Sequence, residues 1–184
     1  LRKSFRHRPE MLAAMLDGKW DLAEGMNELI RDSWVQQAHE QGLYPQRHWH
    51  LIVCDVARFG DDETTIYPME DTEIVPDLVQ IYGRRDTMYT ASALWILAGR
   101  MSERYNMGGA QNVTIFIDEI GVGAGPIDRL REMGAWVFAI NSATKSAEPE
   151  RFYNLRAEMW WLAGEMFGGG EIGLRRYRDD TLDG

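Results

Sequence analysis

The sequence predicts an α/β protein built on one mixed β-sheet with helices on its faces. Three observations support this class. Short apolar runs typical of strands alternate with longer stretches of helical periodicity, and three strands precede the first long helix. Strand–helix alternation then follows, which gives a sheet that combines antiparallel and parallel pairs. The expected order is β-β-β-α-β-α-β-α.

The composition agrees with a single folded domain. The chain has 184 residues, of which 45% are hydrophobic and 27% charged, values typical of globular proteins. No window holds the roughly 18 consecutive apolar residues of a membrane span, and no signal-peptide pattern is present. We therefore expect no membrane partner and no secretion. The single cysteine, Cys54, excludes an intramolecular disulfide and fits a reducing compartment.

Residues 1–49 are expected to form an irregular, partly helical lead-in. Pro9 can open a short helix, and a second helix is expected within Asn27–His39. The lead-in is electrically neutral, because residues 1–50 carry seven basic and seven acidic side chains. The chain begins at Leu1, so we expect it to be a piece of a longer protein.

The sheet is expected to begin at residue 50. Leu51–Cys54 is a continuous apolar run, typical of a strand buried on both faces, and Asp55 follows it. A turn at residues 60–62 leads to a second strand at Thr64–Tyr67, so the two strands should form a hairpin. A third strand is expected at Leu78–Tyr82.

The second half of the chain alternates helix and strand. The expected elements are, in order, a helix from about Thr87 to Tyr105, a strand at Val113–Ile117, a helix that starts at Pro126, a strand at Trp136–Ile140 and a final helix over about Phe152–Met166. Trp160 and Trp161 on the final helix are expected to lie in the core.

Two aspartates directly follow the most apolar strands. Asp55 ends the first strand and Asp118 ends the fourth. Functional groups in α/β sheets gather at the carboxyl ends of strands, so the two carboxylates are expected within metal-bridging distance. Carboxylate oxygens suit hard cations such as Mg²⁺. An aspartate after a strand often serves only as a turn former, and that interpretation stays open.

The negative charge is concentrated near the first of these aspartates. Residues 51–80 carry eight acids and one base, Arg58, against a formal net charge of −9 for the chain. Asp61 and Asp62 in the hairpin turn are further candidate metal ligands or ordinary solvated acids. This charge argues against a protein that merely coats DNA. It is compatible with an enzyme that holds divalent cations.

Several other chemistries lack their sequence patterns. The chain has no G-x-x-x-x-G-K-[ST] motif and should not hydrolyse ATP by itself. Its four histidines show no zinc-ligand spacing, and no G-x-S-x-G motif is present. The glycines at 121–125 lack the full dinucleotide-binding spacing, and Cys54 is expected to be a buried core residue.

Several segments resemble the nuclease domain of tailed-phage terminase large subunits. Val53–Thr64 is similar to the first strand and hairpin of that domain, Phe116–Leu130 to its second acidic motif, and Tyr153–Trp161 to its downstream helix. Leu16–Asp21 and Leu29–Val35 resemble the segment that joins the ATPase motor to the nuclease. The resemblance follows the family's order through nearly the whole chain.

The resemblance implies an RNase H-like fold and a metal-dependent endonuclease that cuts concatemeric double-stranded viral DNA. Two ions, Mg²⁺ or Mn²⁺, would serve the hydrolysis, with Asp55 bridging both and Asp118 as the second acid. Asp61 or Asp62 would be an accessory acid. The family's third acid lies in a later stretch that has no counterpart here, and Glu158 is expected to have a supporting role.

The resemblance also implies the partners. Residues 1–49 would lead in from an upstream ATPase motor, residues 50–184 would form an incomplete nuclease domain, and the portal and small terminase subunit would join the assembly. The place of action would be the host bacterial cytoplasm, at the procapsid. DNA phosphates would be held by basic side chains, which could equally be solvated surface charge: Arg58, Arg175, Arg176 and Arg178.

Two alternative functions remain open at the level of sequence. The chain could be a catalytically silent module that docks on the packaging motor and positions DNA, which would account for the missing third acid. It could also be another RNase H-like nuclease of the resolvase type, although the lead-in resemblance weighs against this.

Overall fold

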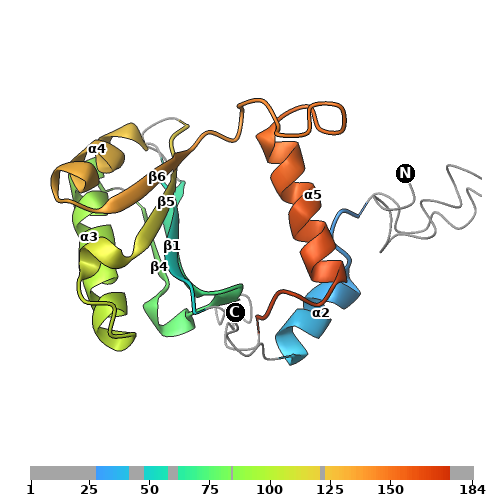
Figure 1. Ribbon diagram of the computed structural model, residues 1–184, viewed down its shortest axis with the longest axis horizontal. Coiled ribbons are helices and arrows are strands. Elements are labelled where there is room, and N and C mark those ends of the chain that lie inside the picture. Colours follow the sequence, from blue (N-terminus) through green and yellow to red (C-terminus); the bar gives the residue numbers. More distant parts are fainter. Residues whose placement is uncertain (1–27, 42–47, 58–61, 84, 121–122, 175–184) are drawn as a thin grey trace, which may run out of the picture.

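The computed structural model describes residues 28–41, 48–57, 62–83, 85–120 and 123–174 (Figure 1). The predicted helix at Pro9 therefore lies outside the described residues. None of the described helices is long and apolar enough to cross a membrane.

The described residues form a mixed sheet of six strands. The strand order is β3-β2-β1-β5-β6, and β4 pairs with the other half of β2. β1 is antiparallel to β2 and parallel to β5, which is parallel to β6. The strands are β1 (His50–Asp55), β2 (Glu63–Glu70), β3 (Glu73–Ile74), β4 (Gln80–Gly83), β5 (Thr114–Asp118) and β6 (Trp136–Ile140). The predicted hairpin and parallel strands are confirmed.

Helices lie on both sides of this sheet, as predicted (Figure 1). α3 (Thr87–Arg104) and α4 (Ala124–Glu132) lie on one side, and α2 (Asp32–Glu40) and α5 (Leu155–Gly168) lie on the other. α4 begins two residues before the predicted Pro126. Proline is tolerated there because the first turn of a helix needs no N–H donor.

The hydrophobic core lies between the sheet and the α3–α4 layer. It includes Ile52, Cys54, Ile66, Leu94, Leu97, Ile115, Ile117 and Leu130, all of which are buried. Alternate residues of a strand face opposite sides of a sheet, so every second residue of β1 and β5 enters this core. The neighbouring residues face the other side, which we call the open face.

The open face corrects one sequence expectation. β1 is not buried on both faces, because Val53 is 39% exposed while Ile52 and Cys54 are buried. The continuous apolar run suggested full coverage. The described helices form a tight layer with the sheet on the α3–α4 side alone, where the buried core cluster lies.

Helix α5 corrects a second expectation. Trp160 was expected in the core but is 55% exposed, as are Met159 and Leu162 to similar degrees. Gly164 is the one residue of α5 that is buried. The helix carries apolar residues all round, so its periodicity did not reveal which residues have packing partners.

The edge of the sheet also differs from the prediction. The third predicted strand starts later, at Gln80, because Pro76–Leu78 forms a short 3₁₀ turn. The two-residue strand β3 was not predicted. It pairs with the end of β2, and Glu73 also bridges to Gly173 after α5.

Candidate active site

Asp55 and Asp118 are the last residues of the adjacent parallel strands β1 and β5. Cys54 pairs with Ile117 in this register, and both of those side chains are buried in the core. The next residue of each strand therefore faces the open side, at the same height. Neighbouring strands lie about 4.8 Å apart. The fold thus ends both strands at the same edge of the sheet, with Asp55 and Asp118 at neighbouring positions.

The turn after β5 holds Asp118 in place. Its Oδ1 accepts a hydrogen bond from the Ile120 backbone N–H at 2.9 Å, and the Glu119 N–H donates to the Ile140 carbonyl at 3.0 Å. Asp118 is therefore a turn former as well as a candidate ligand. The two interpretations left open by the sequence are compatible, because one carboxylate has two oxygens and several lone pairs.

The chain after β1 is held by the neighbouring strand. The Ala57 backbone N–H donates to Oγ1 of Thr64 at 3.2 Å, and Thr64 is buried. In the antiparallel register, Asp55 lies opposite Thr65 of β2. These contacts restrict the backbone on both sides of the Asp55 carboxylate, which is exposed to solvent.

A close approach between α4 and β5 shapes the same edge. Gly123 begins α4, and a Cβ there would overlap the Asp118 carbonyl oxygen and lie 2.9 Å from Cα of Glu119. A glycine is needed at this position because the helix packs directly against the backbone that carries Asp118. This contact explains one glycine of the segment 121–125, whose glycines lack the full dinucleotide-binding spacing.

The remaining predicted site residues are distributed as follows. Asp62 is exposed and directly precedes β2, at the same end of the sheet as Asp55. The other candidates lie outside the described residues: Arg58, Asp61, Arg175, Arg176 and Arg178. Within the described part of the chain, no group of three or more His, Cys, Asp or Glu side chains comes together.

The donor set fits a hard divalent cation. Asp55 and Asp118 supply carboxylate oxygens, which Mg²⁺ and Mn²⁺ prefer, and Mg²⁺ commonly keeps several waters beside one or two protein carboxylates. Two acids are therefore sufficient to hold such an ion with water completing its shell.

Two other residues of β1, Cys54 and His50, are not part of the candidate site. Burial raises the pKa of the Cys54 thiol to about 12, helped by the charge of Asp55. Since the thiolate is the nucleophile, this cysteine is a core residue, as expected. His50 stands at the opposite end of β1 and stacks on Tyr105, with ring centroids 3.8 Å apart.

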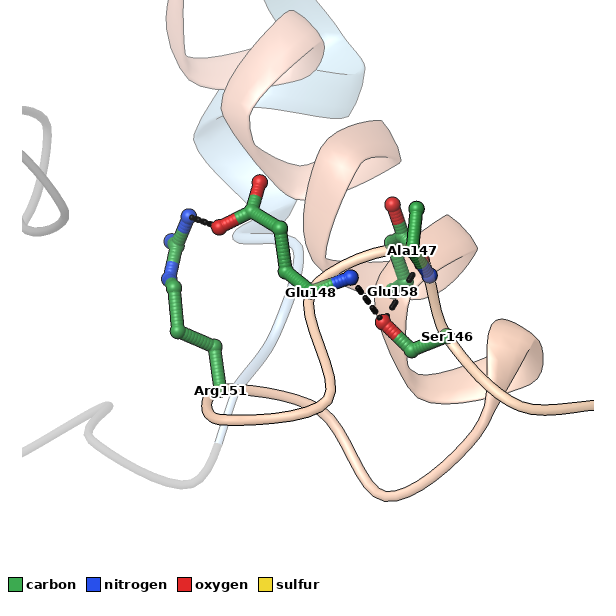
Figure 2. Close-up of polar contacts among 5 residues, drawn as sticks. All are labelled: Ser146, Ala147, Glu148, Arg151 and Glu158. Atoms are coloured by element: carbon green, nitrogen blue, oxygen red, sulfur yellow. Dashed lines mark hydrogen bonds and ion pairs between the residues drawn. The ribbon is translucent and has the colours of Figure 1, made fainter.

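The segment that joins β6 to α5 starts at the same edge of the sheet, but none of its residues was predicted to belong to the site. Asp118 pairs with Ile140, the last residue of β6. The missed signal is a pair of cations, Lys145 and Arg156, on either side of an exposed aromatic residue, Tyr153. Glu158 has the supporting role predicted for it, because it accepts hydrogen bonds from Ser146 and Ala147 (Figure 2).

Comparison with known proteins identifies the fold. No protein-family model and no curated protein matches the chain. A mutant nuclease domain of the large terminase subunit gp2 of bacterial virus Sf6, with manganese and beta-thujaplicinol, superposes with a TM-score of 0.57 at 14% identity, over 84% of this chain and 76% of that one. The large terminase nuclease of thermophilic phage G20c with bound magnesium gives 0.55 at 14% identity, over 85% and 77%.

A third solved structure agrees with these two. The nuclease domain of Sf6 gp2 without the mutation superposes with a TM-score of 0.54 at 13% identity, over 84% of this chain and 77% of that one. At such low identity the likeness establishes the fold. The predicted RNase H-like architecture is thereby confirmed.

Proposed function

We propose that this chain is the nuclease domain of a tailed-phage terminase large subunit. Its activity would be divalent-metal-dependent endonucleolytic cleavage of concatemeric double-stranded DNA. The observation that carries this proposal is the pair of carboxylates, Asp55 and Asp118, at the carboxyl ends of adjacent central strands. The fold is one that solved terminase nuclease domains share, and two of those are bound to manganese or magnesium.

Asp55 and Asp118 are the residues that would hold the divalent metal. Bound metal supplies an activated water and neutralises charge on the phosphate and leaving oxygen. The protein's own contribution is orientation. The Ile120 N–H restrains the Asp118 carboxylate, and the Ala57–Thr64 hydrogen bond restrains the chain that leaves Asp55.

The accessory roles form part of the same proposal. Asp61 and Asp62 are the candidates for a further acid near the metals, and Arg58, Arg175, Arg176 and Arg178 for phosphate contacts. The lead-in at 1–49 would join residues 50–184 to an upstream ATPase motor. The portal and small terminase subunit would be partners at the procapsid in the bacterial cytoplasm.

A second candidate function rests on the acids that the described residues bring together. Within the described part of the chain, no group of three or more His, Cys, Asp or Glu side chains is arranged to hold a metal ion. A packaging module that docks on the motor and positions DNA without cutting it would have this arrangement.

The test is incubation of the chain with supercoiled plasmid and Mn²⁺. We expect nicking and linearisation, and a loss of at least about 100-fold in Asp55→Asn and Asp118→Asn, because metal assistance contributes several kcal/mol to such a step. Asp128→Asn is the matched control, since this acid is exposed on α4 and pairs with Arg131. It should cut like the parent.

Each outcome decides between the candidates. Cleavage that depends on Asp55 and Asp118 excludes the silent module. Cleavage that survives both substitutions contradicts the assignment of the site. If the parent binds plasmid but never cuts it in Mg²⁺ or Mn²⁺, the silent positioning module becomes the better description of this chain. A preference for branched DNA over plain duplex would favour the resolvase type.

A further inference from the structure

The segment that connects β6 to α5, Asn141–Asn154, leaves the sheet beside the paired carboxylates. β6 is parallel to β5 and pairs with it up to Asp118 and Ile140. The segment therefore starts at the same edge as Asp55 and Asp118, and it crosses from the sheet to the helix on the open side (Figure 1). We call it the β6–α5 loop.

The loop and the first turn of α5 expose two cations and an aromatic ring. Lys145 and Arg156 are exposed, and Tyr153 is 94% exposed. Within the described part of the chain neither cation forms an ion pair, whereas Arg151 of the same loop is neutralised by Glu148 at 2.7 Å. Tyr153 lies between these two cations in the sequence. Because its side chain is almost fully exposed, the ring gains no stability from packing in this structure.

Backbone hydrogen bonds fasten the two ends of the loop to each other. The Leu155 N–H donates to the Thr144 carbonyl at 2.8 Å, and the Arg156 N–H donates to the Ser142 carbonyl at 2.9 Å. Nη2 of Arg156 also donates to the buried Ser142 hydroxyl at 3.1 Å. Lys145 directly follows Thr144, and Arg156 directly follows Leu155. The Leu155–Thr144 hydrogen bond therefore brings the backbones of the two cations close together.

Glu158 secures the other side of Lys145. Its Oε2 accepts the Ser146 hydroxyl at 2.7 Å and the Ala147 N–H at 2.9 Å (Figure 2). Ser146 is buried, and its Oγ accepts the Glu148 N–H. Lys145 thus stands between two anchored residues, Thr144 and Ser146. The backbone of this exposed cation is ordered before any ligand binds, which reduces the entropy lost on binding.

We propose that Lys145, Tyr153 and Arg156 form a DNA-contact site on the β6–α5 loop and the first turn of α5. The two cations bind phosphates of the duplex, and the tyrosine ring packs against a sugar or an accessible base. In a chain of net charge −9, affinity for DNA must come from such local groups. This inference rests on the proposed function, because the ligand is the substrate of that nuclease.

The test measures DNA binding separately from cleavage. The whole chain is titrated in EDTA against a fluorescent 30-base-pair duplex of arbitrary sequence, and anisotropy is followed at several salt concentrations. We expect Lys145→Gln to weaken binding roughly three- to tenfold, and the slope of log K against log salt to fall by about 0.9, the value for one lost phosphate contact. Tyr153→Ser should weaken binding roughly fivefold or more, while Tyr153→Phe should bind like the parent.

Arg100→Gln is the matched control. Arg100 is an exposed cation on α3, on the opposite side of the sheet. Arg100→Gln removes one positive charge, as Lys145→Gln does. Because Arg100 lies away from the β6–α5 loop, this substitution should leave the affinity and the salt slope unchanged. Thermal melting of each variant verifies that it is folded.

The outcomes separate this inference from the proposed function. If the parent nicks plasmid but Lys145→Gln and Tyr153→Ser bind duplex as tightly as the parent, the contact site is wrong and the nuclease stands. If Lys145→Gln and Arg100→Gln lose affinity equally, the effect is one of overall charge and the site is again overturned. If the loop variants lose binding while the parent never nicks, the contact site stands and the catalytic proposal fails. A parent that binds no duplex overturns both.

Discussion

Asp118 has a structural role in addition to the metal-binding role proposed for it. Its Oδ1 closes the turn after β5 through the Ile120 N–H, and its position beside Asp55 suits a divalent cation. A carboxylate that is already hydrogen-bonded loses less freedom when it becomes a ligand. The turn therefore contributes to the site instead of competing with it.

His50 provides a residue-scale test at the opposite end of β1. Its ring stacks on Tyr105, and Nε2 lies 3.8 Å from Oε1 of Glu70, with both side chains largely buried. Burial lowers the pKa of His50 below its ordinary value of 6.5, and the nearby carboxylates of Glu70 and Asp71 oppose this only in part. Folding therefore favours the neutral imidazole.

The sign of the pH dependence follows from this shift. Below pH 6.5 the unfolded chain binds a proton that the folded chain resists, so the free energy of unfolding should decrease as the pH falls through this value. Well above pH 6.5 the imidazole is neutral in both states, so the protonation of His50 no longer lowers the free energy of unfolding. In urea denaturation between pH 5 and 8, His50→Gln should show a shallower decline than the parent. An unchanged slope in His50→Gln would contradict this account.

At the scale of elements, the approach of α4 to β5 sets the geometry of the site. Gly123 packs directly on the backbone of Asp118 and Glu119, and a Cβ on Gly125 would lie 3.2 Å from Oγ1 of Thr87 on α3. Small residues let these two helices and the strand approach closely. The edge that carries Asp118 therefore depends on Gly123 and Gly125 having no Cβ.

Gly123→Ala tests this packing. The new Cβ would overlap the Asp118 carbonyl oxygen, so either the helix or the end of β5 must shift. We expect a loss of about 1–3 kcal/mol in the free energy of unfolding, together with weaker Mn²⁺ binding measured by calorimetry. Gly99→Ala is the control, because a Cβ on this α3 glycine would meet nothing within 4 Å. Relative to glycine, alanine in a helix should stabilise by about 0.5–1 kcal/mol. Equal effects of the two changes would refute the argument.

The start of α5 depends on a second element-scale contact. Glu158 accepts hydrogen bonds from the Ser146 hydroxyl and the Ala147 N–H. These two contacts hold the first turns of α5 to the loop that precedes the helix.

Glu158→Ala should destabilise the protein by about 1–3 kcal/mol, the usual cost of leaving polar groups without partners. Urea denaturation measures this loss. Glu150→Ala changes an exposed acid of the same loop and should lie within about 0.5 kcal/mol of the parent. A Glu158 variant as stable as the Glu150 variant would show that the anchor is dispensable.

At the scale of the whole molecule, the distribution of charge is more informative than its total. The net charge is −9, and residues 51–80 contribute eight acids against one base. Among the acids that the structure describes, Asp62 and Glu63 lie at the same end of the sheet as Asp55, whereas Glu70 and Glu73 lie at the opposite end, beside His50. An ion bound at the end that carries Asp55 relieves repulsion between neighbouring carboxylates, so metal binding should stabilise the fold as a whole.

Thermal denaturation with Mn²⁺ tests this coupling. A free ion concentration 100 times the dissociation constant adds about 2.7 kcal/mol, which for a chain of this size raises Tm by roughly 5–10 °C. Asp55→Asn should abolish the rise, whereas Asp128→Asn should keep it. The same rise in the parent and in Asp55→Asn would place the bound ion elsewhere.

The sequence by itself determined the order of elements and the position of both aspartates along the chain. Period-two and helical patterns are local, so they identified β6 to the residue and α3 to within one residue. They also placed Asp55 and Asp118 at the ends of strands. They missed β3 and the 3₁₀ turn at Pro76, because such short elements carry no periodicity.

Only the tertiary structure decided which surfaces are covered and which residues meet. Val53 and Trp160 have the local pattern of core residues but are exposed, because burial depends on whether another element packs against them. The contacts of Glu158 with Ser146 and of Gly123 with Asp118 depend in the same way on how the chain turns back in space. Local pattern specifies the chemistry of each residue along the chain. Its neighbours are specified only by the packing of the whole fold.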